Sequence, residues 1–370
     1  MASSTPDYTS PSQLRTHLSR VFRPLSALTP LHGGFANYTY RATLSSLSSP
    51  SSTSPISPGI PTTPTTVIIK HGEPFVALAQ NIALDTSRVY IEFASLSCPP
   101  PAVTTALGWT VGTPIAHHYD SESHSVVVAD AGSGSRDLKA ILCSAAGLDA
   151  DAEALGEALG VWLRRLHSWG RTEAAEELRE ALGGNTQAAG IWTWATYGRL
   201  LETVALLPAA ELGGAAALFA EIVAATPAVQ LPDTVLHGDF WCGNVLLDKS
   251  TVTIIDWEMA RVGEVWGDLA QMCAELYLPF RFFGVETGIA IMRAFLGAYG
   301  RVSEDIASRV VVHFGVHLAV WPARSGWEPQ TEAVRCAVVG KEFIEKGWRR
   351  DWKWVKDSVL GELVDDSWIV

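Results

Sequence analysis

A polar loop enclosed by short apolar segments constrains the fold of this chain more than any other feature. Residues 237–244 have the sequence His-Gly-Asp-Phe-Trp-Cys-Gly-Asn, with apolar segments at 233–236 and 245–247 on either side. A third apolar segment, 252–255, leads directly into an Asp-Trp-Glu tripeptide. Short runs rich in β-branched residues and bounded by polar clusters are typical of strands. The sequence therefore predicts a strand, a polar loop and two further strands, the last of which ends in a pair of carboxylates.

The acidic and amide side chains of this region can hold a divalent cation beside a proton acceptor. Asp239 can take a proton from an attacking hydroxyl group or orient that group, and we expect it to be the catalytic residue. Mg²⁺ prefers hard oxygen ligands and usually retains several waters. The expected metal ligands are Asn244, Asp256 and Glu258. For Glu258, a helix cap or an ion pair with Arg261 is an equally open alternative.

A lysine at the end of a predicted strand can contact the phosphates of a nucleotide. Lys70 ends the β-branched segment 66–70, and a helix is predicted from about residue 85 to residue 97, where prolines stop it. A flexible lysine needs a carboxylate to hold it in place. Glu92 on the predicted helix is the best placed, and Glu73 is the alternative.

The turn before the second predicted strand contains two consecutive glycines, Gly33 and Gly34. Glycine lets the backbone approach a ligand closely, and successive backbone N–H groups can surround a phosphate. We expect Gly33, Gly34 and Asn37 to belong to the nucleotide-binding part of the chain. A plain hairpin is the alternative.

Composition along the chain separates a strand-rich N-terminal part from a helix-rich C-terminal part, as in an α+β fold with two lobes. Residues 1–19 are expected to be a flexible N-terminus, although residues 12–18 could begin a short helix. Residues 20–131 are expected to form a small, mainly β nucleotide-binding lobe, and 132–370 a larger, mainly helical lobe that carries catalysis and binds the acceptor. A Ser/Thr/Pro-rich run at about 45–66 cannot bury enough apolar area to offset its ordering entropy, so we expect a disordered insertion. Apolar periodicity predicts helices at 152–168, 173–182, 209–225, 283–299, 303–319 and 329–346.

The overall charge and the cysteines limit the class of protein. A net charge of −12 over 370 residues argues against a general nucleic-acid binder, which needs a basic surface. The five cysteines form no CxxC pair and are odd in number, as expected of reduced thiols in the cytoplasm. No apolar run approaches about 18 residues, so no membrane span is expected. The oligomeric state stays open.

The motif residues together resemble the aminoglycoside phosphotransferase and choline kinase family, whose fold is similar to that of protein kinases. The catalytic-loop pattern of that family, HGDxxxxN, matches His237, Gly238, Asp239 and Asn244. Its metal-binding acid after a short strand matches Asp256. The resemblance covers about residues 30–275.

The resemblance implies an ATP- and Mg²⁺-dependent kinase with a two-lobed, protein-kinase-like fold. It implies Asp239 as catalytic base or hydroxyl-orienting group, Asn244 and Asp256 on Mg²⁺, and Lys70 on the α- and β-phosphates. The expected reaction moves the γ-phosphoryl group of ATP to a hydroxyl of a small molecule, such as a sugar, an amino alcohol or an aminoglycoside-like compound. A pseudokinase or nucleotide-binding scaffold without turnover is the rival hypothesis.

Two comparisons within the family bear on the acceptor. Gly238 stands where protein kinases place an arginine that meets a phosphorylated activation loop, which favours a small-molecule acceptor. Residues 69–76 and 88–92 resemble the nucleotide lobe of methylthioribose kinases, which also use an Asp-x-Glu metal motif. The loop residues 240–242 and the Ser/Thr/Pro insertion depart from those enzymes. We therefore expect this chain to share the kinase reaction of methylthioribose kinases, but we do not expect it to share their sugar acceptor.

Other side chains near these motifs are expected to be structural. His237 should hydrogen-bond the backbone around the loop, and Asp268 should brace the loop or cap the following helix. Cys242 is expected to be a bystander. His313 and His317, four residues apart on a helix, lack the glutamate of a zinc motif and are expected in the core or a substrate cleft. The late tryptophans should pack, with Trp321 and Trp327 as candidates for the acceptor site.

Overall fold

The computed structural model describes most of the chain as two compact units. The first unit comprises Met1–Pro99 and Pro114–Ser135, and the second comprises Pro100–Thr113 and Arg136–Val370. The described residues are 6–31, 34–45, 66–144, 148, 151–207, 214–226 and 232–369. Gly33 and nearly all of the Ser/Thr/Pro-rich run lie outside them.

The first unit is built on a five-stranded antiparallel sheet in the order β1-β2-β3-β9-β8. Tyr38 of β2 pairs with His71 of β3, and Lys70 pairs across to Val126 of β9. Lys70 therefore lies at the end of a central strand, as expected. The strands are β1 (Leu25–Pro30), β2 (Tyr38–Leu44), β3 (Thr66–His71), β8 (Ala116–Asp120) and β9 (Ser125–Ala129).

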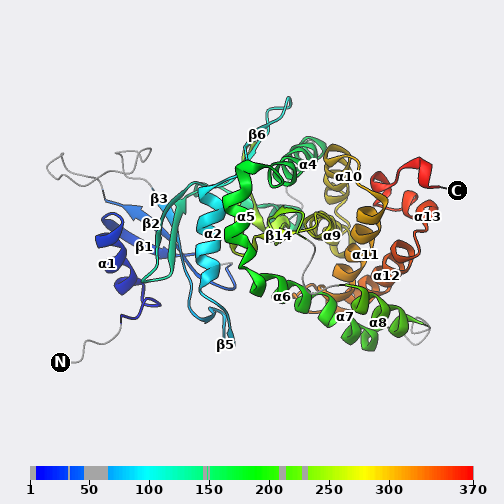
Figure 1. Ribbon diagram of the computed structural model, residues 1–370, viewed down its shortest axis with the longest axis horizontal. Coiled ribbons are helices and arrows are strands. Elements are labelled where there is room, and N and C mark those ends of the chain that lie inside the picture. The colour runs from blue at the N-terminus through cyan, green and yellow to red at the C-terminus, as the bar shows by residue number, and fades with distance from the viewer. Residues whose placement is uncertain are drawn as a thin grey trace. The chain divides into compact units, whose positions relative to one another are not determined.

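Two helices cover opposite faces of this sheet (Figure 1). Helix α1 (Pro11–Val21) packs Leu14 and Leu18 into a core with Val67 and Ile69 of β3. Successive residues of a strand point to opposite faces, so Lys70 points away from α1. It meets α2 (Ser87–Ser97), which packs against β8 and β9. A short hairpin, β4 (Phe75–Val76) and β5 (Ala79–Ala83), lies between β3 and α2 in the chain.

Helix α1 corrects one expectation. Residues 1–19 were expected to be flexible, but α1 begins at Pro11, and both Leu14 and Leu18 are fully buried. The apolar face of a single three-turn helix is a weak signal in the sequence. It becomes structural only because the sheet supplies an apolar face to cover.

The second unit contains a five-stranded sheet in the order β10-β12-β13-β7-β6 and a separate pair, β11 with β14. All neighbours in the sheet are antiparallel except β13 and β7. The strands are β6 (Val103–Thr104), β7 (Thr110–Gly112), β10 (Arg136–Asp137), β11 (Thr234–Leu236), β12 (Val245–Asp248), β13 (Thr251–Ile254) and β14 (Arg261–Gly263).

The parallel pairing of β7 with β13 explains a second difference from expectation. Residues 100–113 were assigned to the N-terminal lobe, but Thr110 and Val111 pair with Thr251 and Val252. This segment therefore belongs to the second unit. The pairing joins positions about 140 residues apart, which no local pattern in the sequence can reveal.

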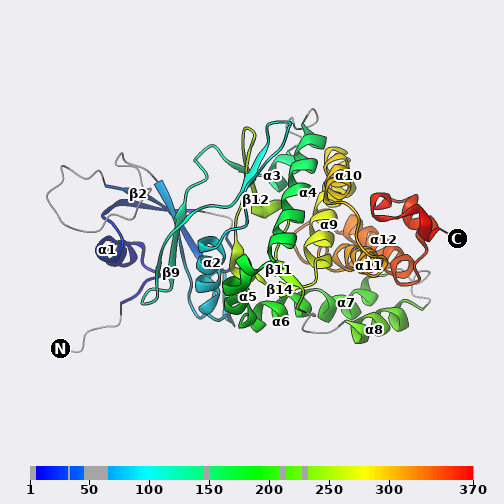
Figure 2. The same ribbon diagram turned by 45° about the horizontal axis from the view of Figure 1, so that its top comes forward.

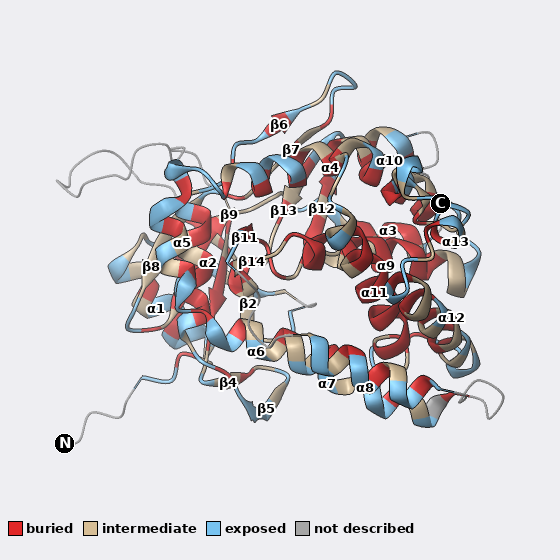
Figure 3. Ribbon diagram, turned by 45° about the vertical axis from the view of Figure 1, so that its right-hand side comes forward, coloured by how far each residue is buried: buried red, intermediate tan, exposed pale blue. Residues whose placement is uncertain are grey.

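Helices make up the rest of the second unit, and α9, α11 and α12 lie side by side (Figure 2). Helices α9 and α11 are buried along most of their length (Figure 3). On α4, Gly156 and Gly160 allow α10 to approach closely, since a Cβ at either would lie 2.3 Å from a carbonyl oxygen of that helix. The helices are α3 (Leu138–Cys143), α4 (Ala152–Trp169), α5 (Glu176–Gly183), α6 (Thr186–Ala195), α7 (Tyr197–Thr203), α8 (Ala215–Ala225), α9 (Trp266–Phe283), α10 (Thr287–Tyr299), α11 (Glu304–Val320), α12 (Gln330–Trp348) and α13 (Trp352–Lys356).

The architecture is the expected α+β class, with a mainly β first unit and a mainly helical second unit. Most predicted elements are present, with ends displaced by a few residues. One helix was predicted to begin too early: the sequence suggested 283–299, whereas α10 begins at Thr287 and a separate helix, α9, ends at Phe283. None of the helices in the described ranges is long and apolar enough to cross a lipid bilayer.

Candidate active site

The loop between β11 and β12 has a backbone geometry that requires glycine. Gly238 has φ of +83°, in the left-handed region. A Cβ at this position would lie 2.0 Å from the carbonyl oxygen of Met259 and 2.4 Å from the Arg261 guanidinium. Arg261 donates to the Gly238 carbonyl at 2.9 Å. The structure therefore has no room for a side chain at the position where protein kinases carry arginine.

A buried carboxylate at the start of α9 braces this loop. The two oxygens of Asp268 accept the backbone N–H groups of His237 at 2.9 Å and Gly238 at 3.0 Å. His167 lies 3.3 Å from the same carboxylate. Burial by itself would raise the pKa of Asp268, but the hydrogen bond from His167 and nearby positive charge outweigh it and lower that pKa. The expected bracing role is confirmed.

His237 is part of the same support. It is fully buried, and its Nε2–H donates to the Ile255 carbonyl at 3.0 Å, which leaves Nδ1 to accept the Asp239 backbone N–H at 3.3 Å. Burial, the largest effect, lowers the pKa of His237. A neutral ring with both nitrogens engaged by the backbone is structural, as expected.

Two amide side chains hold the carboxylate of Asp239. Gln271 donates from Nε2 to Oδ1 at 2.6 Å, and Asn244 donates from Nδ2 to Oδ2 at 3.1 Å. Asn244 also donates to the Asp239 carbonyl at 2.9 Å. Both oxygens are thus oriented by neutral donors. Sequence reasoning did not identify Gln271, which lies 32 residues beyond Asp239 in the chain.

The charge state of Asp239 is sensitive to its surroundings. Burial and then the negative charge of Asp256 raise its pKa, while the hydrogen bond from Gln271 acts in the opposite direction. A raised pKa is typical of a carboxylate that exchanges protons with a substrate. The two carboxylates are therefore close enough to influence each other, as a shared site requires.

The expected metal ligands lie on the elements that follow the loop. Asn244 closes the single turn η4 (Cys242–Asn244), and because its amide nitrogen points to Asp239, its Oδ1 is turned away from that residue. Asp256 has φ of +69°, uncommon for a residue with a side chain. Glu258 is buried in the following turn, η5 (Trp257–Met259).

The oxygen donors of this region suit Mg²⁺ better than a transition metal. In the described part of the chain, no three His, Cys, Asp or Glu side chains cluster as a metal site. An amide oxygen with one or two carboxylates is a hard and incomplete ligand set. Mg²⁺ commonly uses such a set and completes it with water and phosphate oxygens.

The three residues inside the loop pack rather than point to solvent. Phe240 is fully buried, with its ring centre 5.8 Å from that of Trp162. Trp241 folds back over Gly243, where a Cβ would lie 2.3 Å from the indole ring. The Cys242 thiol is buried, and burial raises its pKa well above the usual value, so it is not a reactive thiolate.

In the first unit, Lys70 and Glu92 form the expected ion pair. The Lys70 ammonium lies 2.7 and 3.0 Å from the two oxygens of Glu92, and the side chains are 11% and 2% exposed. Glu73, the alternative partner, instead pairs with His71 at 2.9 Å. The strand lysine is thus held by the helix carboxylate.

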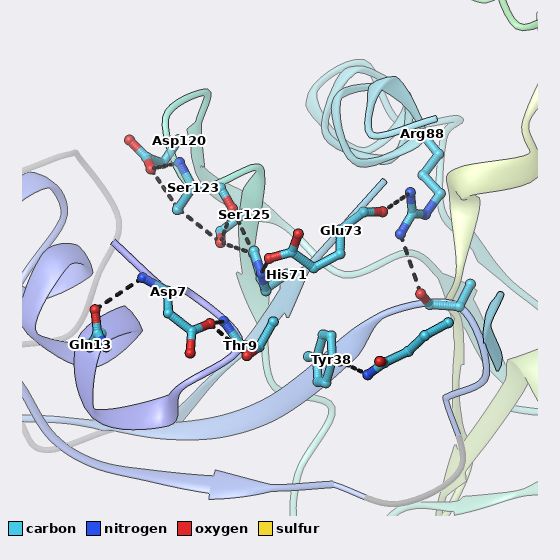
Figure 4. Close-up of polar contacts among 12 residues, drawn as sticks. Asp7, Thr9, Gln13, Tyr38, His71, Glu73, Arg88, Asp120, Ser123 and Ser125 are labelled. Atoms are coloured by element: carbon cyan, nitrogen blue, oxygen red, sulfur yellow. Dashed lines mark hydrogen bonds and ion pairs between the residues drawn. The ribbon is translucent and has the colours of Figure 1, made fainter. Parts of the chain in front are cut away.

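Arg88, one helical turn before Glu92, joins the segments around this ion pair. It donates to the Glu73 carbonyl at 3.1 Å (Figure 4), to the Ala36 carbonyl at 3.3 Å and to Oδ1 of Asn37 at 3.1 Å. Asn37 is 7% exposed. The asparagine predicted to touch nucleotide therefore connects the turn at 34–37 to α2, and Gly33 of that turn lies outside the described residues.

His313 and His317 are both buried on α11, as expected. His313 bonds through Nδ1 to the Tyr197 hydroxyl at 3.1 Å and stacks on Trp192, with ring centres 4.7 Å apart. Burial lowers its pKa well below the usual value. His317 pairs with Glu275 of α9 at 2.8 Å. Sequence reasoning did not identify Glu275.

Comparison with known proteins agrees with this geometry. Residues 130–309 match the model of a family described as the phosphotransferase enzyme family. The chain is 24% identical to the phosphotransferase FrzJ of Cladobotryum sp, over 91% of this chain and 92% of that protein. It is also 24% identical to a 4-hydroxytryptamine kinase of Psilocybe cyanescens, over 95% and 94% of the two chains.

A solved structure supports the fold independently. The GDP complex of an aminoglycoside 2′-phosphotransferase-IIIa mutant has a TM-score of 0.51 with 12% identity, and the match covers 93% of this chain and 99% of that one. The fold and the braced loop define a phosphotransferase of protein-kinase-like fold. Residues 130–309 match the model of the phosphotransferase enzyme family, and the enzyme is a small-molecule kinase.

Proposed function

We propose that the chain transfers the γ-phosphoryl group of ATP to a hydroxyl group of a small molecule, with Asp239 as the catalytic residue. The observation that carries this proposal is the set of hydrogen bonds that holds Asp239 in place. Its carboxylate is oriented by two amides, on a loop whose backbone is bonded to the buried Asp268. Such rigid positioning is what phosphoryl transfer chiefly requires of a protein.

In the proposed step, the acceptor oxygen attacks the γ-phosphorus while the bond to the β–γ bridging oxygen breaks. The products are the phosphate ester of the acceptor and ADP. The hydroxyl proton passes to Asp239, or is directed by it as the new bond forms. The raised pKa of Asp239, caused mainly by burial, favours this exchange of a proton.

Lys70 is proposed to contact the α- and β-phosphates. Its pairing with Glu92 fixes the ammonium at the end of β3, in the position from which a strand lysine contacts phosphates in kinase-like folds. Arg88 and Asn37 act indirectly in this proposal, because they fix the turn at 34–37 against α2.

Asn244 and Asp256 are the proposed ligands of Mg²⁺, with Glu258 as the third candidate. When bound, the ion would neutralise the charge of the phosphate oxygens. The protein's own contribution is to orient the two oxygen donors. It does so through the bond from Asn244 to Asp239 and through the short turn that follows Asp256.

The acceptor is proposed to be a compact molecule that carries both a hydroxyl group and an amine. Two similar proteins are 4-hydroxytryptamine kinases, and each matches at least 87% of this chain. A cytoplasmic setting suits cysteines that form no CxxC pair and are odd in number.

An acceptor screen tests this function. The full-length protein would be incubated with Mg-ATP and a panel of hydroxy-amines, sugars and aminoglycosides, and the phosphorylated products identified by mass spectrometry. We expect at least one hydroxy-amine to be phosphorylated, and no product with Asp239→Ala. Nucleotide binding without turnover across the panel would instead favour the nucleotide-binding scaffold.

A further inference from the structure

His71, the last residue of β3, belongs to a polar network in the first unit that the proposed function does not use (Figure 4). The residue is only 1% exposed. Successive residues of a strand point to opposite faces, so His71 faces away from the ion pair of Lys70 with Glu92. Its Nδ1 lies 2.6 Å from the Ser123 carbonyl oxygen, and its Nε2 lies 2.9 Å from Oε1 of Glu73. The ring therefore joins the turn between β8 and β9 to the segment that follows β3.

Both partners of this ring are acceptors. A neutral imidazole has one N–H group and one lone pair, so it can donate to the Ser123 carbonyl or to Glu73 but not to both. The Ser125 hydroxyl, 3.5 Å from Nδ1, does not supply the missing proton, because it donates to the same Ser123 carbonyl at 3.2 Å. With an ionised Glu73, only an imidazolium satisfies both contacts. The hydrogen bonds therefore require two protons, and a positive charge, on this buried histidine.

The charged and titratable groups that face the ring favour its positive charge. Besides Glu73, the carboxylate of Asp7 acts on it: a hydrogen bond from the Thr9 hydroxyl chiefly, and the charge of the imidazole more weakly, lower the pKa of Asp7. The Tyr8 ring lies 6.2 Å from the imidazole, and Tyr38 of β2 stacks on it at 5.9 Å. Burial chiefly raises the pKa of Tyr8 to about 12, so this phenol is neutral. The charges that face the ring are therefore carboxylates, which stabilise an imidazolium.

The segment that this ring holds also contacts the turn that is proposed to bind nucleotide. Glu73 accepts from the imidazole at its carboxylate and from Arg88 of α2 at its backbone carbonyl, the latter at 3.1 Å. Arg88 in turn donates to Oδ1 of Asn37. Gly72 fits closely between them, since a Cβ there would lie 3.1 Å from Nη2 of Arg88 and 3.2 Å from Oδ1 of Asn37. A shift of residues 72 and 73 would therefore displace the turn at 34–37.

We propose that His71 is a positioning residue for the nucleotide and that its charge makes ATP binding depend on pH. Doubly protonated, the ring holds Glu73 and, through Arg88, the turn at 34–37. When the ring loses a proton at higher pH, one of its two acceptors loses its donor, and the turn is held less firmly. Mg-ATP therefore binds more weakly as the pH rises. This inference rests on the proposed function and adds a regulation of the same site.

The test compares nucleotide binding by wild type and two variants at several pH values. Binding of Mg-ADP to the full-length protein would be measured by isothermal titration from about pH 5.5 to about pH 8.5, the range in which histidines commonly change charge. ADP has no γ-phosphoryl group to transfer, so binding is measured apart from turnover. Phosphate groups titrate in the same range, and each variant is therefore compared with wild type at the same pH.

The first variant, Glu73→Gln, removes the need for the second proton. An amide can donate as well as accept. It can accept from an imidazolium, and it can donate to Nε2 of a neutral ring while Nδ1–H donates to the Ser123 carbonyl. The segment after β3 should therefore stay in place in this variant at every pH of the series.

The second variant, His17→Gln on α1, is the matched control. His17 also lies between two acceptors in the first unit. These are Asp120 at 2.8 Å and the Tyr8 hydroxyl at 3.1 Å, whose own proton is donated to Glu122. Among the described residues, none of the hydrogen bonds of His17 reaches the segment 72–74. His17→Gln thus removes a similar histidine without touching the path to the nucleotide.

We expect the Kd of wild type, divided by the Kd of Glu73→Gln, to rise about 3- to 10-fold from the lowest to the highest pH, within the range of one ordinary hydrogen bond. The same ratio for His17→Gln should stay constant. A constant ratio for Glu73→Gln, or an equal rise for His17→Gln, would overturn the proposal.

Nitrogen-15 spectra of labelled histidine rings test the charge directly in the wild-type protein. At about pH 6, the His71 ring should show two protonated nitrogens, and one of the two protons should be lost as the pH is raised. A neutral His71 ring at about pH 6 would overturn the proposal, and this measurement does not depend on whether either variant folds.

A turnover measurement distinguishes this inference from the proposed function. The pH dependence of KM for ATP should follow the binding data, whereas the ratio of kcat between wild type and Glu73→Gln should stay constant, because His71 acts on the nucleotide turn. Phosphorylation of an acceptor together with a constant Kd ratio would refute the role of His71 alone. A Kd ratio that rises with pH, without phosphorylation of any acceptor, would refute the proposed function alone.

Discussion

The hydrogen bond from Gln271 to Asp239 should be worth one to two orders of magnitude in kcat. Gln271→Met keeps the length of the side chain and removes the donor that lies 2.6 Å from Oδ1. A hydrogen bond to a charged group contributes about 1.5–3 kcal/mol. At about 1.4 kcal/mol for each factor of ten in rate, kcat should fall about 10- to 150-fold if the bond serves to orient Asp239 in the transition state.

Steady-state kinetics with both substrates varied is the appropriate assay for Gln271→Met. An orienting role predicts a fall in kcat with KM for ATP unchanged, because Gln271 contacts the catalytic carboxylate and not Lys70. Gln330→Met, at an exposed position, is the matched control. Gln271→Met with kcat within twofold of wild type would refute the reasoning. A fall in kcat accompanied by a proportionate loss of melting temperature would show that the bond is structural.

Three further predictions concern the support of the site. Lys70→Met should reduce kcat/KM for ATP at least about tenfold and lower the free energy of unfolding by about 3–5 kcal/mol, because it leaves Glu92 charged and buried. Adding Glu92→Leu should restore the melting temperature but not the activity. Recovery of activity in the double variant would contradict the role assigned to Lys70. Gly238→Ala should destabilise the protein by about 2–4 kcal/mol in denaturant unfolding, since its Cβ would strike a carbonyl oxygen. Gly190→Ala, which has open space around it, should be neutral or stabilising. Equal effects of the two substitutions would contradict the structure. Asp268→Asn should lower the melting temperature most at neutral pH, because the pKa of Asp268 is lower in the folded state than in the unfolded state. The charge of Asp268 therefore stabilises the folded protein above about pH 4, and this contribution disappears as the pH falls through the folded-state pKa. A difference in melting temperature that grows on acidification would contradict this sign.

The parts of the site that could be predicted from sequence are those whose residues are local or have a characteristic environment. Asp239, Asn244 and Asp256 lie within 18 positions of one another between strands that alternate visibly. Lys70 ends a β-branched strand, and Glu92 lies on a helix with a clear start and stop. Residue type, spacing along the chain and the predicted ends of strands and helices were sufficient to identify these site residues.

The residues that sequence reasoning missed act across long separations. Gln271 and Glu275 reach the catalytic region only through the register of α9, which follows the loop after three further strands. A signal was present, however. Asp268, Gln271 and Glu275 repeat on one face of a helix that is otherwise apolar, and a polar stripe in a buried helix needs partners.

One feature of the fold was hidden for a different reason, and another was only weakly indicated. The grouping of residues 100–113 with the second unit depends on the parallel pairing of β7 with β13, and parallel pairs carry no turn or hairpin signal. Helix α1 has only two fully buried leucines, so its stability comes from the sheet that it covers and little from its own sequence.

The most direct test of the account is a single-turnover transfer experiment. The full-length enzyme in excess would be mixed with ATP labelled in the γ-phosphate, Mg²⁺ and 4-hydroxytryptamine or the best acceptor found by screening, and the label followed into product. We predict that wild type transfers the label to the acceptor, whereas Asp239→Asn binds ATP with wild-type affinity but transfers at least about 1,000-fold more slowly. Transfer by Asp239→Asn at a rate near that of wild type would contradict the assignment of Asp239 as the catalytic residue.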